Sequence, residues 1–184
     1  MKNVTAVIPV RKGSVRVKNK NIKPFAGTSL LELKIRQLKN IPQIDDIIVS
    51  TDCENMAVTA MREGINVHIR DEYYASSKAN NSEFFKNLAE SIECDHIMYS
   101  PVTCPLISPE TYFECLTLYK ENDIENLVTT SLVKHHMWLD NKPLNYDIDR
   151  SPNSQDLPDI HAITYGICLI SRENMIKYSN VVTP

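Results

Sequence analysis

The sequence predicts a single α/β domain, residues 1–184, built on a mixed, mostly parallel, doubly wound sheet. Short apolar runs alternate with amphipathic segments four times in about 120 residues. The runs are rich in β-branched residues, which is typical of strands buried on both faces of a parallel sheet. The length of 184 residues suits one domain with a core of its own.

Four strand–helix pairs follow from this alternation. The strands are expected at 4–10, 45–52, 65–70 and 95–100, and the helices at 28–41, 53–64, 80–92 and 108–122. In the first helix the apolar positions 30, 31, 35 and 38 make one face, after Thr28 or Ser29 as N-cap. Gly64 is expected to end the second helix, and Ser108 with Pro109 to begin the fourth. A polar loop is expected at 71–79.

The pattern changes after residue 125. Two strands are expected at 126–136 and 162–171, separated by a stretch rich in proline, asparagine and aspartate. The intervening segment 137–160 is too long for an idle loop. We therefore expect it to be an excursion from the domain that contacts substrate or pairs subunits.

Composition excludes several classes of protein. The hydrophobic content of 42% and charged content of 23% are ordinary for a globular domain, and no apolar run approaches the roughly 18 residues of a membrane span. No signal peptide is recognisable, and the five cysteines form no CxxC pair, which favours the cytoplasm. The net charge of −3 does not indicate nucleic-acid binding. We expect neither nucleic acid nor membrane as a partner.

The charge is nevertheless distributed unevenly. Residues 1–31 carry seven basic residues and no acidic one, whereas residues 32–184 carry thirteen basic and twenty-three acidic residues, a balance of −10. Most of the early positive charge lies in the stretch RKGSVRVKNKN, residues 11–21, directly after the first buried strand. Ligands of open α/β sheets bind at the carboxyl ends of strands, so this loop is a candidate phosphate site. It contains neither GxxxxGK[ST] nor GxGxxG, and a solvated cationic loop is the alternative.

The same stretch resembles the N-terminal signature of the cytidylyltransferases that activate sialic acids and related nonulosonic acids, the CMP-sialate synthetases. The matching residues are Arg11, Gly13, Ser14, Lys20 and Asn21. Further segments resemble later motifs of that family in the same order. They are IIVSTD at 47–52, Arg70 after the third strand, TCPL at 103–106, SQDLP at 154–158 and YGICLI at 165–170.

The resemblance implies a nucleotide-diphospho-sugar transferase (Rossmann-like) fold and transfer of CMP from CTP to a nonulosonic acid. It implies that Arg11 and Lys20 act in catalysis, and that they bind CTP together with Ser14, Asn21 and Arg70. Thr103 and Gln155 would contact the sugar acid. A homodimer paired through the excursion is also implied. From the residues alone, Arg70 at a strand end equally fits a surface ion pair, and Asp52 fits either a helix cap or a nucleotide contact.

The chain also departs from the family pattern. Val15 replaces the usual lysine, with Arg16 beside it, and Pro101 and Ile107 replace the glutamine and arginine of the sugar-side motif. Mg²⁺ is implied as cofactor, but the family's Asp-x-Asp segment lies beyond the point where this chain ends, at NVVTP. We therefore assign no metal ligand from the sequence. The changed sugar contacts favour a nonulosonic acid other than N-acetylneuraminic acid.

Two other functions remain open at this point. One is a sibling nucleotidyltransferase that activates another sugar acid, of the 3-deoxy-octulosonate type. The other is a catalytically weak nucleotide-binding homologue on the same fold.

Overall fold

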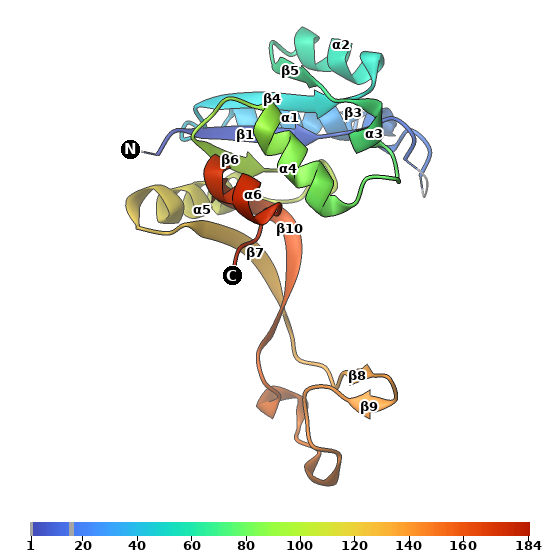
Figure 1. Ribbon diagram of the computed structural model, residues 1–184, viewed down its shortest axis with the longest axis vertical. Helices are drawn as coiled ribbons and strands as arrows, with labels where there is room; N and C mark the ends of the chain where they lie inside the picture. Colours follow the sequence, from blue (N-terminus) through green and yellow to red (C-terminus); the bar gives the residue numbers. More distant parts are fainter. Residues whose placement is uncertain (1, 15–16) are drawn as a thin grey trace. The chain divides into compact units, whose positions relative to one another are not determined.

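The computed structural model describes residues 2–14 and 17–184 (Figure 1). Within these residues the main sheet has six strands in the order β5-β4-β1-β6-β10-β7. β1 pairs in parallel with β4 and β6, β4 pairs in parallel with β5, and β10 runs antiparallel to β6. The predicted mixed, mostly parallel sheet is confirmed. The strands are β1 (Val4–Pro9), β4 (Asp46–Thr51), β5 (Asn66–Ile69), β6 (His96–Tyr99), β7 (Asn126–Val133) and β10 (Ile160–Ser171).

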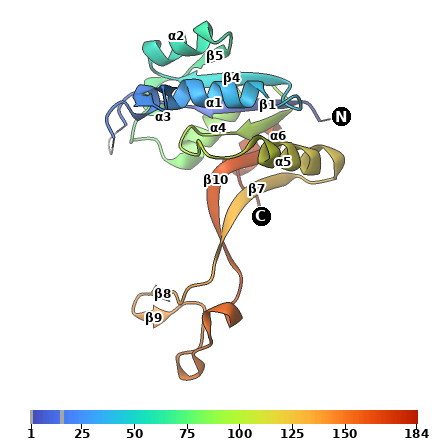
Figure 2. The ribbon, with the colours of Figure 1, turned by 180° about the vertical axis from the view of Figure 1, so that it is seen from behind.

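The chain forms two compact units, one of residues up to Val128 together with Tyr165–Pro184, the other of Thr129–Thr164. In the first unit, helices cover both faces of the sheet (Figures 1 and 2). The longer helices are α1 (Leu30–Lys39), α2 (Glu54–Arg62), α4 (Asn81–Ser91), α5 (Pro109–Glu121) and α6 (Arg172–Tyr178). No helix within the described residues is long and apolar enough to cross a membrane.

The helix boundaries follow from their capping residues. The Ser29 hydroxyl accepts a hydrogen bond from the Glu32 amide at 3.2 Å, so Ser29, one of the two expected N-caps, begins α1. Asn80 and Glu83 cap each other reciprocally at the start of α4. Gly64 lies just beyond α2 with φ of +72°, the left-handed conformation that a C′ glycine supplies.

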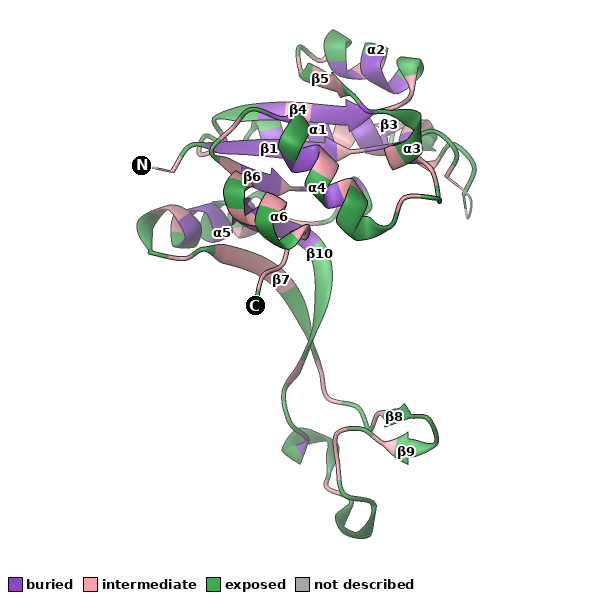
Figure 3. Cartoon of the chain, in the orientation of Figure 1, coloured by how far each residue is buried: buried purple, intermediate pink, exposed green. Residues whose placement is uncertain are grey.

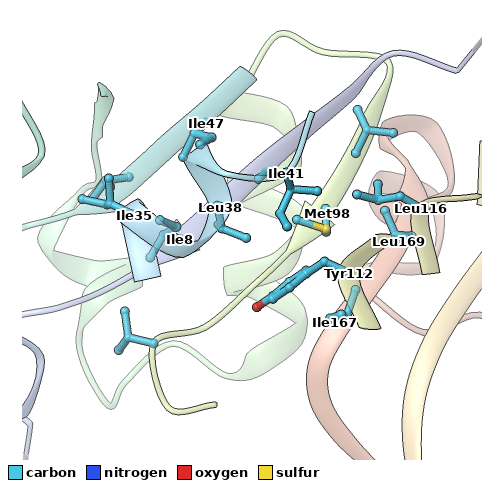
Figure 4. Packing of buried hydrophobic residues seen from close by; sticks show 14 of the residues in the cluster. Ile8, Ile35, Leu38, Ile41, Ile47, Met98, Tyr112, Leu116, Ile167 and Leu169 are labelled. Carbon is cyan, nitrogen blue, oxygen red and sulfur yellow. The ribbon is translucent and has the colours of Figure 1, made fainter. Parts of the chain in front are cut away.

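Two layers of apolar side chains sandwich the sheet. Val4, Ala6 and Ile8 of β1 face one layer with residues of α1, α2 and α5, whereas Val7 faces the other with α4 and α6. This alternation is the period of two that a strand imposes. Figure 3 shows the buried residues concentrated on the sheet and the inner faces of these helices, and Figure 4 shows part of the first layer. The core thereby fixes the carboxyl ends of β1, β4, β5 and β6 at one edge.

A buried polar cluster interrupts the first layer. The Lys34 side chain is 1% exposed although it belongs to the apolar face of α1. Its ammonium donates to the Tyr112 hydroxyl at 2.6 Å, the Gln37 side-chain oxygen at 2.7 Å and the Cys104 carbonyl at 2.9 Å. Burial lowers the pKa of Lys34 to about 8. All three ammonium donors are thus satisfied inside the protein.

The second unit holds a small hairpin of β8 (Trp138–Leu139) and β9 (Lys142–Pro143), followed by the short 3₁₀ turns η2 (Ile148–Arg150) and η3 (Ser154–Asp156). The Lys134 ammonium pairs with the Asp159 carboxylate at 2.5 Å. Trp138 and His136 each pack edge-on against Tyr146. The expected excursion 137–160 lies inside this unit.

Two local expectations were wrong, and one of the two alternatives for Asp52 is excluded. The stretch 71–79 is not all loop, because α3 (Glu72–Ala75) begins after Asp71, whose carboxylate caps the Tyr73 amide. The strand expected at 126–136 ends at Val133. Asp52 does not cap α2, because Cys53 occupies the N-cap position. Instead, the Asp52 carboxylate accepts a hydrogen bond from the Lys12 amide at 2.8 Å.

Candidate nucleotide site

A pocket of about 850 Å³ lies at the carboxyl ends of β1, β5 and β6. This is the edge at which open α/β sheets bind ligands. Three stretches of the chain contribute its walls. They are Pro9, Val10, Arg11, Ser14, Val17, Lys20 and Asn21; Arg70, Tyr74, Ser76, Ser77, Ala79, Asn81 and Phe84; and Tyr99, Pro101, Val102 and Thr103.

The residues predicted to bind CTP come together in this pocket. Arg11, Ser14 and Lys20 line it from the first loop, and Arg70 lines it from the end of β5. Thr103, expected at the sugar acid, lines it from the loop after β6. Gln155, the other expected sugar contact, lies in η3 of the second unit, where its backbone carbonyl accepts a hydrogen bond from Lys134.

The first loop is tied to the sheet by its own polar groups. The buried Asn21 side chain donates to the Arg11 carbonyl at 3.2 Å, which closes the loop across ten residues. Gly13 has φ of +77°, a conformation that residues with a Cβ rarely adopt. With the Lys12 amide held by Asp52, the loop leaves the sheet at a defined place. Val15, which replaces the family's usual lysine, and its neighbour Arg16 lie outside the described residues.

Arg70 is the most deeply buried cation of the pocket, with 5% of the residue exposed. Its guanidinium donates to the Val10 carbonyl at 2.5 Å and lies 5.0 Å from the centre of the Phe84 ring. The Nε atom is buried without a hydrogen-bond partner. Burial lowers the pKa of Arg70 below its usual value, and the Asp52 carboxylate opposes that shift. Of the two functions left open for Arg70, its position favours the pocket over a surface ion pair.

The pocket is positively charged. Arg11, Lys20 and Arg70 line it, and none of its described lining residues is acidic. The Arg11 guanidinium donates to the Ala75 carbonyl at 2.8 Å, so it spans from the first loop to the end of α3. Cations in a concave, partly dry site attract phosphates far more strongly than the same cations on an open surface.

One wall of the pocket was not anticipated from the sequence. It consists of residues from α3, the segment after it and the start of α4, namely Tyr74, Ser76, Ser77, Ala79, Asn81 and Phe84. A signal was present, because a polar stretch follows the third strand at the same sheet edge. Only the tertiary structure shows that this stretch turns back toward the first loop.

The described residues do not by themselves form a metal site. No group of three or more His, Cys, Asp or Glu side chains lies close enough to hold an ion in the parts of the chain that the structure covers. Asp52 is near Arg70 and engages the Lys12 amide. Mg²⁺ is usually held by one or two carboxylates together with substrate phosphates, so Asp52 by itself would not complete a site. No magnesium ligand is therefore assigned.

Comparison with known proteins identifies a family. The family described as Cytidylyltransferase matches residues 5–166 of the chain. An N-acylneuraminate cytidylyltransferase of Oncorhynchus mykiss is 26% identical over 164 residues, which are 84% of this chain and 38% of that protein. A pseudaminic acid cytidylyltransferase of Campylobacter jejuni is 30% identical over 105 residues, 56% of this chain and 45% of that protein. This chain thus matches less than half the length of either relative.

Solved structures confirm the fold. A CMP:2-keto-3-deoxy-manno-octonic acid synthetase, determined in complex with CTP, superposes with a TM-score of 0.72 at 15% identity. The superposition covers 99% of this chain and 79% of that one. At this identity the likeness shows that the two share a fold, as expected for the nucleotide-diphospho-sugar transferase type.

Proposed function

We propose that this chain, which belongs to the cytidylyltransferase family, transfers CMP from CTP to the anomeric hydroxyl of a sialic-acid-like nonulosonic acid and releases pyrophosphate. The observation that carries the proposal is the meeting of Arg11 and Lys20, from the first loop, with Arg70, from the end of β5, in one pocket without a described acidic lining residue. A triphosphate is the ligand class that this charge balance favours. The names of the two curated relatives support a nonulosonic acid as the acceptor.

The chemistry requires alignment and charge neutralisation. The anomeric oxygen forms a bond to the α-phosphorus while the bond from that phosphorus to the bridging oxygen of the β-phosphate breaks. The bonding pair leaves with pyrophosphate, and the hydroxyl proton passes to solvent. Negative charge develops on the phosphate oxygens in the transition state, so fixed cations beside them lower the barrier. Positioning the two reactants supplies the remainder of the rate enhancement.

Each pocket residue has a role in this proposal. Arg11 and Lys20 stabilise charge on the triphosphate, and the Ser14 hydroxyl donates to a phosphate oxygen. Arg70 contacts the nucleotide from the end of β5. Asn21 orients the triphosphate by holding the first loop in place. Thr103 contacts the sugar acid. Mg²⁺ is expected from the family resemblance, but no described lining residue is a carboxylate, and we derive no step through the ion.

The decisive experiment combines binding and turnover. At a CTP concentration 100 times its Kd, ligand-linked stabilisation is about 2.7 kcal/mol, which raises the melting temperature by roughly 5–10 °C in a chain of this size. ATP, GTP and UTP at the same concentration should shift it less. Pyrophosphate release is then measured with CTP, Mg²⁺ and a panel of sialic, pseudaminic and 3-deoxy-octulosonic acids.

The outcomes separate the candidate functions. Release with a nonulosonic acid supports the proposal, and release with only 3-deoxy-octulosonate favours the sibling enzyme. A CTP-specific shift without turnover on any acid favours a nucleotide-binding homologue. Equal shifts with all four nucleotides would leave a generic phosphate site and reject the proposed specificity.

We further propose that the protein is a cytoplasmic homodimer that pairs through the excursion 137–160. The five cysteines are free, which supports a reducing compartment. The second unit exposes Trp138, Leu139, Leu144 and Ile148, each with more than half of its surface accessible. Apolar side chains gathered on so small a unit are typical of an interface.

Disruption of this interface should produce monomers. Trp138 is 53% exposed in the single chain, so we expect it to become buried in the dimer, with Trp138→Glu monomeric in sedimentation velocity at micromolar concentration. Leu118→Glu is the matched control, because Leu118 is 52% exposed but lies on α5 of the first unit. A wild-type monomer whose only tryptophan fluoresces as fully exposed would contradict the proposal.

A further inference from the structure

The loop between β6 and α5 forms one wall of the pocket and is held from behind. Pro101, Val102 and Thr103 line the pocket, and the next residue, Cys104, presents its carbonyl to the Lys34 ammonium at 2.9 Å. The Cys104 amide closes a turn onto the Pro101 carbonyl at 3.5 Å. Thr103, which lines the pocket, and Cys104, which Lys34 holds, are therefore adjacent in the sequence.

A second contact from the same helix holds the other end of the loop. The Gln37 side-chain nitrogen donates to the Ile107 carbonyl, and the Gln37 oxygen accepts from Lys34 at 2.7 Å. The two side chains are one helical turn apart, so they act as a linked pair. Together they fix the loop at Cys104 and Ile107, on either side of Leu106, which is 91% exposed.

The chemistry of Lys34 makes a purely packing role a poor explanation. A buried ammonium is costly unless its protons are bonded, and replacing buried ionic groups with apolar side chains of similar volume is often neutral for stability. A methionine would fill the volume but could not bond the Cys104 carbonyl. What the lysine adds is a fixed distance between α1, the α5 residue Tyr112 and the pocket loop.

We propose that Lys34 is a positioning residue for the sugar-acid side of the pocket, acting through the Cys104 carbonyl to place Thr103. The inference rests on the proposed function, which assigns Thr103 to the sugar acid and the triphosphate to Arg11 and Lys20. Those cations lie on the loop after β1 rather than on the one that Lys34 holds. Loss of Lys34 therefore affects one substrate more than the other.

The test compares wild type with Lys34→Met, Gln37→Leu and the control Lys2→Met. Lys2 is matched because its ammonium also donates to three acceptors, the carbonyls of Tyr119, Asn122 and Ile124, at the other end of α5. Lys34→Met should raise the KM for the sugar acid at least about fivefold and the KM for CTP less than about twofold. Gln37→Leu should act in the same direction with a smaller effect, and Lys2→Met should change neither KM.

A second readout needs no activity. Amide hydrogen exchange over residues 101–107 should accelerate at least about fivefold in Lys34→Met and stay at the wild-type rate in Lys2→Met. Unchanged exchange in a folded Lys34→Met protein, or equal acceleration in the lysine control, overturns the inference. If Lys34→Met does not fold, Gln37→Leu decides by the same two measurements.

The two proposals fail in different ways. Absence of pyrophosphate release by wild type with every sugar acid rejects the proposed function, while the exchange measurement still tests the placement of the loop. Normal turnover by wild type, together with equal rises of both KM values in Lys34→Met, rejects the assignment of Lys34 to the sugar-acid side alone.

Discussion

Arg70→Ala should lower kcat/KM for CTP at least about 100-fold. The guanidinium is almost fully buried. It donates a hydrogen bond to the Val10 carbonyl and lies over the Phe84 ring in the pocket. A charge-assisted contact to the nucleotide is worth roughly 1.5–3 kcal/mol. The substitution also removes the Arg70 donor from the Val10 carbonyl, directly before Arg11 in the site. About 2.7 kcal/mol corresponds to a factor of 100 in transition-state stabilisation. Steady-state pyrophosphate release, with CTP affinity from calorimetry, measures the loss.

Two further variants separate charge from geometry. Arg70→Lys keeps a positive charge but loses the planar fork, so we expect at least a tenfold loss to remain, by roughly 1.4 kcal/mol. Arg62→Ala is the control, since Arg62 is an exposed arginine in the last turn of α2 and does not line the pocket. Urea unfolding of all three variants shows how much of the effect is stability. Near-wild-type kinetics for Arg70→Ala would place the nucleotide elsewhere.

Much of the fold could be predicted because local and tertiary preferences agree. The first strand is apolar except at Thr5, and the structure buries alternate side chains of β1 on both faces of the sheet. Ser29, Asn80 and Ser108 begin helices through side-chain bonds to nearby amides. These signals act within a few residues along the chain, so the sequence alone reveals them.

Only part of the pocket could be predicted from the sequence, because one of its walls depends on tertiary structure. The first loop and Arg70 could be placed at one sheet edge because each follows a parallel strand. The wall from α3 and α4 depends on how residues 71–80 turn after β5, and no local pattern encodes that path. The orphan Nε of Arg70 likewise becomes visible only when the surrounding side chains are in place.

The burial of Lys34 in the core also could not be predicted from local sequence patterns. It lies among the apolar positions Leu31, Ile35 and Leu38 of α1, where a lysine is ordinarily expected to reach solvent. Its Cys104 and Tyr112 partners are 70 and 78 residues away in the sequence. A buried ammonium is tolerated only where such acceptors converge, and that convergence is a property of the assembled fold.

Lys20→Ala should lower kcat/KM at least about tenfold, whereas Lys18→Ala should lower it less than about threefold. The two lysines are two residues apart and chemically identical, but Lys20 is half-buried and lines the pocket while Lys18 is exposed and does not. A partly desolvated ammonium facing the β- or γ-phosphate is worth roughly 1.5–3 kcal/mol, and an exposed one about 0–1. Since about 1.4 kcal/mol is a factor of ten, the two losses should be resolved by steady-state kinetics.

Salt dependence provides an internal control for this pair. Any contribution of Lys18 is a long-range attraction that fades as the screening length shortens to about 3 Å near 1 M salt, whereas a direct contact from Lys20 is screened much less. The ratio between the two variants should therefore persist at high salt, and CTP affinities from calorimetry should follow the same order. Equal losses at both positions, vanishing together with added salt, would mean that the loop attracts phosphate only as a diffuse cationic surface. In that case Lys20 makes no specific contact, and the pocket must hold the triphosphate through Arg11 and Arg70.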